Sequence, residues 1–115
     1  LCIISLSDLL TPWETIEKRL LAAAGGDFVI CLYNPASRKR KDYLKKACEI
    51  LRTCKPADTG CGIVKNIDRE GEAFQILSLE ELKETPADMF STVYIGNQET
   101  KVIRGRMVTP RGYKL

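Results

Sequence analysis

The sequence predicts an α/β domain: a mixed sheet of about five strands, flanked by helices. Helical and strand patterns alternate in the first half of the chain, and strand patterns dominate the second half. Two short apolar runs, at 28–33 and 61–66, show no alternation, which is typical of strands buried on both faces. The chain has 115 residues, enough for one domain with a hydrophobic core but too few for two.

The first elements are a short strand and a capped helix. The stretch "LCIISL", 1–6, predicts a strand or the tail of a linker. Thr11 and Glu14 have the spacing of a capping box, and Pro12 favours the first helical position. Apolar residues then follow at helical spacing. The glycine pair 25–26 ends this helix, since either glycine can adopt a positive φ.

The remaining elements alternate between strands and helices. The strand at 28–33 precedes an amphipathic helix predicted at 36–53, in which apolar residues recur at i, i+3, i+4 and i+7. The pattern then predicts strands at 61–66, 73–79 and 91–97, a short helix at 80–84, and a hairpin at 100–109 that turns at Arg104-Gly105.

Three of these strands end in polar or glycine-containing loops, "YNPAS", "KNIDREGE" and "IGNQET". Ligands of open α/β sheets bind outside the carboxyl ends of the strands. We therefore expect one binding cleft along the three loops. The alternative is that all three are ordinary solvated turns.

Composition and charge narrow the possible functions. The net charge of +3 is too small to indicate nucleic-acid binding by itself. The chain has no histidine, so a Ser-His or Cys-His nucleophile cannot be built from it. The five cysteines are scattered without a C-x-x-C motif, which predicts buried, reduced thiols in a cytoplasmic protein and no metal site. No apolar run approaches the roughly 20 residues that span a bilayer, so we expect no membrane partner.

Longer stretches carry a resemblance to a known family. They are "ISLSDLLTPWETIEKRL", "DFVICLYNPASRKR", "GIVKNIDREGE" and "TVYIGNQETKVIRGRMVTPRGY". Together they resemble the C-terminal half of the precorrin-3B C17-methyltransferases, in the tetrapyrrole methylase family of cobalamin biosynthesis. The resemblance implies a homodimeric enzyme that methylates C17 with ring contraction. It further implies two domains, with S-adenosyl-L-methionine and the precorrin in the cleft between them.

The same resemblance implies that residues 1–115 are the C-terminal domain alone. The family's glycine-rich cofactor motif, G-x-G-x-G-D, belongs to the N-terminal domain and does not occur in this sequence. We therefore expect the chain to be a piece of a longer protein and to carry only part of each binding site.

Site residues can be transferred from the family one position at a time. A Tyr-Met pair closes the first strand of this domain in relatives, which makes Tyr33 and Asn34 cofactor-contact candidates here. A second contact follows a "V-x-N" strand end, which corresponds to Asn66 and Ile67, although relatives often have glycine where Ile67 stands. Either asparagine could instead cap a loop.

Cationic residues are candidates for substrate binding, because precorrins carry acetate and propionate carboxylates around the ring. Arginine binds carboxylates in a two-pronged manner. The substrate-contact candidates are Asp8, Ser37, Arg38, Arg69 and Arg111. For Lys39, Arg40 and Lys41 we expect a solvated face, and the arginines could form surface salt bridges instead. The sequence identifies no catalytic acid or base.

Other functions stay open at this point. The closest alternative is another corrin-pathway methyltransferase with different regiochemistry. A second is a ligand-binding module without turnover. A third is an RNA-binding domain that uses the cations 38–41, although the aromatic residues that base stacking needs are not interleaved with them.

Overall fold

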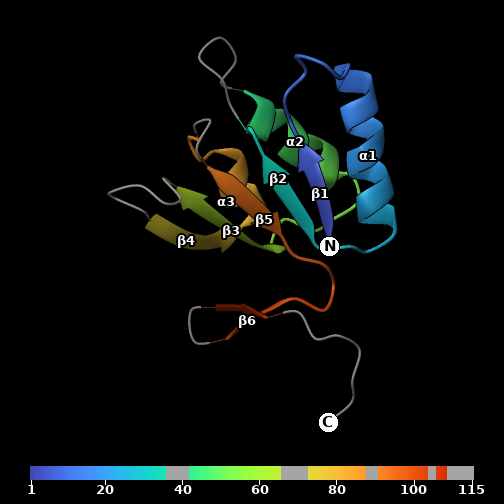
Figure 1. The fold of residues 1–115 in the computed structure, drawn as a ribbon. Helices are drawn as coiled ribbons and strands as arrows, with labels where there is room; N and C mark the ends of the chain where they lie inside the picture. The colour runs from blue at the N-terminus through green and yellow to red at the C-terminus, as the bar shows by residue number, and fades with distance from the viewer. Residues whose placement is uncertain (36–41, 66–72, 88–90, 104–105, 109–115) are drawn as a thin grey trace.

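A computed structural model describes residues 1–35, 42–65, 73–87, 91–103 and 106–108. The described residues form a five-stranded mixed sheet with three helices on one face and a separate two-stranded hairpin (Figure 1). The predicted fold class is confirmed. The elements are β1 (Cys2–Ser5), α1 (Trp13–Gly25), β2 (Ile30–Tyr33), α2 (Tyr43–Arg52), β3 (Gly60–Lys65), β4 (Ala73–Ser78), α3 (Leu79–Lys83), β5 (Thr92–Ile95), β6 (Lys101–Ile103) and β7 (Arg106–Val108).

The strand order in the sheet is β1-β2-β5-β3-β4. The edge pair β1 and β2 is parallel, whereas β5 runs antiparallel to both β2 and β3, and β3 runs antiparallel to β4. The spatial neighbour of β2 inside the sheet, β5, therefore runs in the opposite direction. This direction decides which loops share an end of the sheet.

The helices cover one face of the sheet and bury alternate strand residues. Strand residues of the core are Ile4, Ile30, Leu32, Cys61, Ile63, Leu77, Val93 and Ile95. They pack against one stripe of each helix, formed by Ile16, Leu20 and Ala23, by Leu44, Ala47, Cys48 and Leu51, and by Leu79 and Leu82. Burial of this apolar face supplies the main driving force for folding.

The prediction that the run 28–33 is buried on both faces is confirmed only for its middle. Phe28 precedes the strand and is 49% exposed, and Tyr33 is 42% exposed. Only the middle of the run, Ile30 to Leu32, is buried. Tyr33 alternates with the core residues Ile30 and Leu32, so its side chain lies on the face that the helices do not cover, whereas Phe28 precedes the strand.

The helix termini differ from the sequence predictions. Helix α1 begins at Trp13, and Pro12 is its N-cap with extended backbone (φ −58°, ψ 144°) and no side-chain cap. Thr11 is then one residue too early, so the predicted capping box is wrong. The positive φ at the other end of α1 belongs to Asp27 (φ 55°), not to a glycine.

A complete capping box instead starts α3. Ser78 Oγ accepts a hydrogen bond from the backbone N–H of Glu81 at 3.1 Å, and Glu81 Oε1 accepts one from the Ser78 N–H at 2.9 Å. Hydrogen bonding to Ser78, chiefly the bond from the Ser78 N–H, lowers the pKa of the Glu81 carboxyl. Helix α2 begins at Tyr43 after Asp42, so residue 42 of the predicted helix 36–53 is not helical, and 36–41 lie outside the described residues.

The hairpin of β6 and β7 confirms the predicted hairpin at 100–109, although its turn residues are not among those described. Met107 reaches the sheet at Gly62, where an added Cβ would lie 3.1 Å from Met107 Sδ and 3.2 Å from the Phe74 ring. The missing side chain of Gly62 thus makes room for this contact.

The cysteines only partly match the prediction of buried thiols. Cys31, Cys48 and Cys61 are buried, Cys2 is partly buried and Cys54 is exposed. Burial raises the pKa of the Cys48 and Cys61 thiols to about 12, so both are neutral and poor nucleophiles at physiological pH. Cys54 contradicts the prediction because it follows the end of α2, beyond the helix stripe that faces the core.

Candidate functional site

The two ends of the sheet carry different sets of loops. In the register, Tyr33 of β2 pairs with Thr92 of β5, and Thr92 pairs with Val64 of β3. The loops after β2 and β3 therefore leave from one end, and the loop after β5 leaves from the other. The predicted single cleft along three loops is wrong for "IGNQET", because the carboxyl-end rule assumes neighbouring strands that run parallel.

We name the first end the Asn34 end and define it by Ser5, Asp8, Tyr33, Asn34 and Tyr43. Asn34 has φ 53°, in the left-handed region that asparagine tolerates better than most residues. Its Nδ2 donates to Ser5 Oγ at 3.2 Å, and the Leu6 N–H donates to the Tyr33 carbonyl at 3.0 Å. These bonds tie the carboxyl ends of the parallel strands β1 and β2 together.

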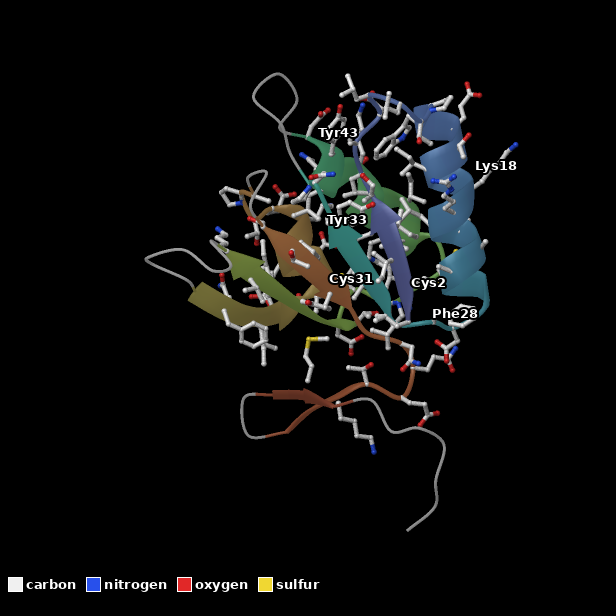
Figure 2. All side chains as sticks on the ribbon, viewed as in Figure 1. Cys2, Lys18, Phe28, Cys31, Tyr33 and Tyr43 are labelled. Atoms are coloured by element: carbon white, nitrogen blue, oxygen red, sulfur yellow. The ribbon has the colours of Figure 1, made fainter. Side chains whose placement is uncertain are left out.

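An aromatic and acidic cluster lies beside this strand pair. The Tyr43 hydroxyl donates to Asp8 Oδ1, and Tyr43 is only 4% exposed. Its ring stacks on Trp13 with a centroid distance of 5.8 Å and an interplanar angle of 12°. Lys46 Nζ lies 5.7 Å from the centroid of the Trp13 ring. Figure 2 shows Tyr33 and Tyr43 toward the same end of the sheet, with Phe28 toward the other.

The structure places three of the predicted site residues, Asp8, Tyr33 and Asn34, at the same end of the sheet. The others, Ser37, Arg38, Asn66, Ile67, Arg69 and Arg111, lie outside the described residues. Pro35 and Lys65, the described residues next to two of those stretches, both stand at the Asn34 end.

Sequence reasoning missed the partners of these residues. Ser5, Trp13 and Tyr43 were not among the candidates, yet they hold Asn34 and Asp8 in place. The contacts span 29 residues for Ser5–Asn34 and 35 for Asp8–Tyr43. No local pattern signals contacts of that separation.

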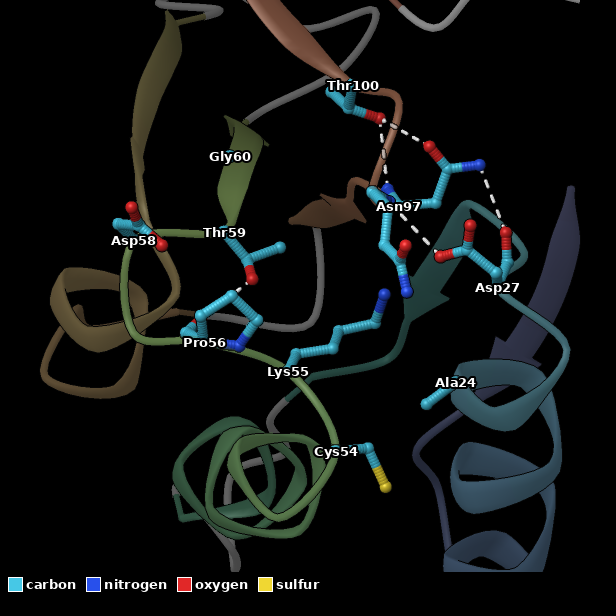
Figure 3. Close-up of a pocket in the computed structure, with 11 residues that line it drawn as sticks. Ala24, Asp27, Cys54, Lys55, Pro56, Asp58, Thr59, Gly60, Asn97 and Thr100 are labelled. Atoms are coloured by element: carbon cyan, nitrogen blue, oxygen red, sulfur yellow. Dashed lines mark hydrogen bonds between the residues drawn. The ribbon is translucent and has the colours of Figure 1, made fainter. Parts of the chain in front are cut away.

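The opposite end, which we name the Asn97 end, is defined by Asp27, Lys55, Thr59, Asn97 and Thr100. These residues line a pocket of about 270 Å³ between the ends of α1 and α2 and the loop after β5 (Figure 3). Lys55 is 7% exposed, and its Nζ donates to the Gly96 carbonyl at 3.0 Å. A hydrogen bond from a buried ammonium to a carbonyl fixes the loop after α2 to the end of β5.

The polar side chains of this pocket bond mostly to backbone groups of the loops that form it. Asn97 Nδ2 donates to the Asp27 carbonyl at 3.0 Å, and the Gln98 N–H donates to Asp27 Oδ1 at 3.1 Å. Asn97 Oδ1 accepts from the Glu99 N–H and from Thr100 Oγ1. The Lys55 ammonium shares the pocket with the carboxylates of Asp27 and Asp58. This arrangement closes loops and is unsuited to an anionic ligand.

The part of the chain that the structure describes holds neither a metal-binding cluster nor a membrane-spanning helix. No group of three or more Cys, Asp or Glu side chains there could hold a metal ion. None of the helices there is long and apolar enough to cross a membrane.

Known proteins resemble this chain along nearly its whole length, although no family model matches it. A probable cobalt-factor III C17-methyltransferase from Salmonella typhimurium is 50% identical over 114 residues, which is 99% of this chain and 47% of the relative. One from Methanocaldococcus jannaschii is 48% identical over 96% of the chain and 47% of its own length. A precorrin-3B C17-methyltransferase from a Sinorhizobium species is 40% identical over 97% of the chain and 46% of its own length.

Solved structures agree with these relatives. The crystal structure of the methyltransferase CobJ matches 95% of this chain and 46% of its own, with a TM-score of 0.83 and 34% identity. The cobalt precorrin-4 methyltransferase CbiF matches 82% of this chain and 39% of its own, with a TM-score of 0.59. At 16% identity, the second likeness concerns the fold alone.

The relatives at 40–50% identity and the CobJ structure show that the chain belongs to the methyltransferases of cobalamin biosynthesis. Within that class, the chain is a homologue of the cobalt-factor III and precorrin-3B C17-methyltransferases, and it corresponds to their C-terminal part. The chain spans about half the length of these relatives. The resemblance predicted from the sequence is confirmed.

Proposed function

We propose that the protein containing this chain methylates C17 of precorrin-3B, or of its cobalt form, with ring contraction, and that residues 1–115 are its C-terminal domain. The observation that carries this proposal is the 40–50% identity to C17-methyltransferases over nearly the whole chain. The CobJ likeness supports the same assignment at the level of structure.

The proposed cofactor is S-adenosyl-L-methionine, which supplies a methyl group on a positively charged sulfur when bound. We assign Tyr33, Asn34, Asn66 and Ile67 to its binding. The described geometry fits this role: Tyr33 offers an accessible ring, and the backbone at Asn34 turns sharply beside it. Because Asn34 Nδ2 already donates to Ser5, its backbone and Oδ1 are the groups that suit the adenosine portion.

The proposed substrate contacts are Ser37, Arg38, Arg69 and Arg111, with Asp8 nearby. Guanidinium groups form charge-assisted, two-pronged hydrogen bonds with the substrate's carboxylates. The domain then contributes chiefly positioning and exclusion of water, because the substrate's own conjugated ring supplies the attacking carbon. This agrees with the absence of histidine from the chain and with the neutral buried thiols.

A direct experiment is to express the complete reading frame that contains this sequence and to supply precorrin-3B or cobalt-factor III with the cofactor. We expect a product heavier by one methyl group, with the new carbon at C17 by NMR. Methylation at a different carbon would favour a neighbouring corrin methyltransferase. Binding without turnover would favour a ligand-binding module. The 115-residue chain alone should fold but should not transfer methyl groups.

We further propose that the complete protein is a cytoplasmic homodimer. The buried free thiols are compatible with a reducing compartment. Several large apolar side chains of the described chain are exposed, among them Ile3 at 68% on the edge strand β1 and Leu1 at 71% just before that strand. Such a patch suits an interface with further protein. Light scattering of the complete protein should give twice the monomer mass, and a monomer at all concentrations would contradict this proposal.

A further inference from the structure

We propose that Asp8 stabilises the positive charge that methyl transfer places on the tetrapyrrole, and that Tyr43 is the positioning residue that holds its carboxylate. This inference rests on the proposed function and deepens it. It begins with the bond from the Tyr43 hydroxyl to Asp8 Oδ1, which joins the loop after β1 to the first residue of α2.

Tyr43 is itself held rigidly. It is 4% exposed, and its ring stacks on Trp13, the first residue of α1. Stacked aromatic pairs of this geometry contribute beyond their simple burial. Because the ring is fixed between two helix ends, its hydroxyl has a fixed position, and the carboxylate that accepts from it is oriented in turn.

The loop that carries Asp8 faces outward on the C-terminal side of that residue. Asp8 is partly buried, whereas Leu9 and Leu10 are 84% and 94% exposed. The Leu9 N–H donates to Ser7 Oγ at 3.4 Å, and the Ser7 N–H donates to Ser5 Oγ at 3.3 Å. Leu9 and Leu10 therefore form an apolar surface beside the anchored carboxylate of Asp8. Such a surface suits the face of a large conjugated ring better than it suits the polar tail of a cofactor.

The charge balance of the reaction gives the carboxylate its role. A ring carbon donates its electron pair to the methyl carbon, the bond from carbon to sulfur breaks, and sulfur keeps that pair and becomes neutral. One positive charge therefore passes from the sulfonium to the tetrapyrrole, where it stays until a proton leaves. A fixed anion beside the ring stabilises the transition state more than the ground state. This argument holds with or without cobalt in the ring.

The test uses the complete protein with Asp8→Asn, Tyr43→Phe and the double variant. We expect the single-turnover methylation rate to fall by about 10- to 100-fold for Asp8→Asn and by about tenfold for Tyr43→Phe. The double variant should be no slower than Asp8→Asn alone, because the proposed role of the hydroxyl is to orient the carboxylate. Asp8→Glu, which keeps the charge, should recover part of the rate.

A second readout requires no turnover. Titration of each variant with the tetrapyrrole in the absence of cofactor should give affinities within about threefold of the parent, since the effect belongs to the transition state. Tyr94→Phe is the matched control: it removes the phenol that interacts with Cys31, outside the proposed site, and should keep the parent rate. Thermal unfolding of each variant shows whether it is folded.

The outcomes separate this inference from the proposed function. A parent protein that makes no methylated product overturns the proposed function and, with it, this role of Asp8. An active parent with an equally active Asp8→Asn variant overturns the inference alone. A loss of substrate affinity as large as the loss of rate also overturns it, because Asp8 would then be an ordinary binding residue. If Asp8→Asn does not fold, the rates of Tyr43→Phe and Asp8→Glu decide.

Discussion

Two asparagines follow strands of the same sheet, Asn34 after β2 and Asn97 after β5, at opposite ends. The Asn97 side chain makes three hydrogen bonds, to the Asp27 carbonyl, the Glu99 N–H and Thr100 Oγ1. Among the described residues, the Asn34 side chain makes one, to Ser5. Each end also has one residue with positive φ, Asp27 or Asn34 itself. The same residue type thus closes one end and leaves hydrogen-bonding capacity at the other, where the proposed ligands bind.

The largest effect is expected from Asn97→Ala. Its three side-chain hydrogen bonds contribute roughly 1 kcal/mol each, so the free energy of unfolding should fall by about 3 kcal/mol. Ligand affinities of the complete protein should stay near those of the parent. Urea denaturation and separate titrations with cofactor and tetrapyrrole measure the two quantities. Weaker ligand binding without a loss of stability would show that the Asn97 end also takes part in binding.

The next effect concerns Arg38. If Arg38 pairs with a substrate carboxylate, Arg38→Ala should weaken tetrapyrrole binding by about 1.5–3 kcal/mol, roughly 10- to 150-fold. Cofactor affinity should change little, and Lys41→Ala is the matched control with the same loss of charge. Calorimetric titration of each variant with each ligand gives the answer. Equal tetrapyrrole affinities for the parent and both variants would mean that the cations 38–41 are only a solvated surface.

A smaller effect is expected at Asn34. Two substitutions there distinguish the contribution of its backbone conformation from that of its side chain. Asn34→Ala places a Cβ residue at φ 53° and should destabilise the fold by about 1–2 kcal/mol. Asn34→Gly tolerates that backbone conformation and should cost less. If the Asn34 side chain contacts the cofactor, both substitutions should weaken cofactor binding more than tetrapyrrole binding. Should Asn34→Gly bind cofactor like the parent, any contact there would be with the backbone alone.

The smallest effect is a pH dependence of the unfolding free energy. It arises at the start of α3, away from both the Asn34 end and the Asn97 end. Hydrogen bonds from Ser78 lower the pKa of the Glu81 carboxyl in the folded state. A depressed folded pKa adds stability above the unfolded pKa of the carboxyl, and that stability is lost as the pH falls through the folded value. The difference in unfolding free energy between the parent and Glu81→Gln should therefore shrink on acidification. A difference that is constant with pH would contradict this.

The sequence by itself determined the order and type of the elements, because periodicity is a local property. The apolar stripe of α2, the glycines at the end of α1 and the hairpin after residue 100 were each recognised from neighbours only a few residues away. The family resemblance also came from local strings. Errors at this level were small and had local causes, such as Pro12 taking the N-cap in place of Thr11.

Only the tertiary structure decided which of these pieces meet. The antiparallel direction of β5 moved "IGNQET" away from the loop after β2, and strand direction is fixed by hydrogen bonds between distant segments. The pairing of Asp8 with Tyr43 likewise depends on how α2 packs beside the β1–β2 edge. A carboxylate in a loop has many accessible orientations, and the hydrogen bond from a buried phenol 35 residues away restricts those of Asp8.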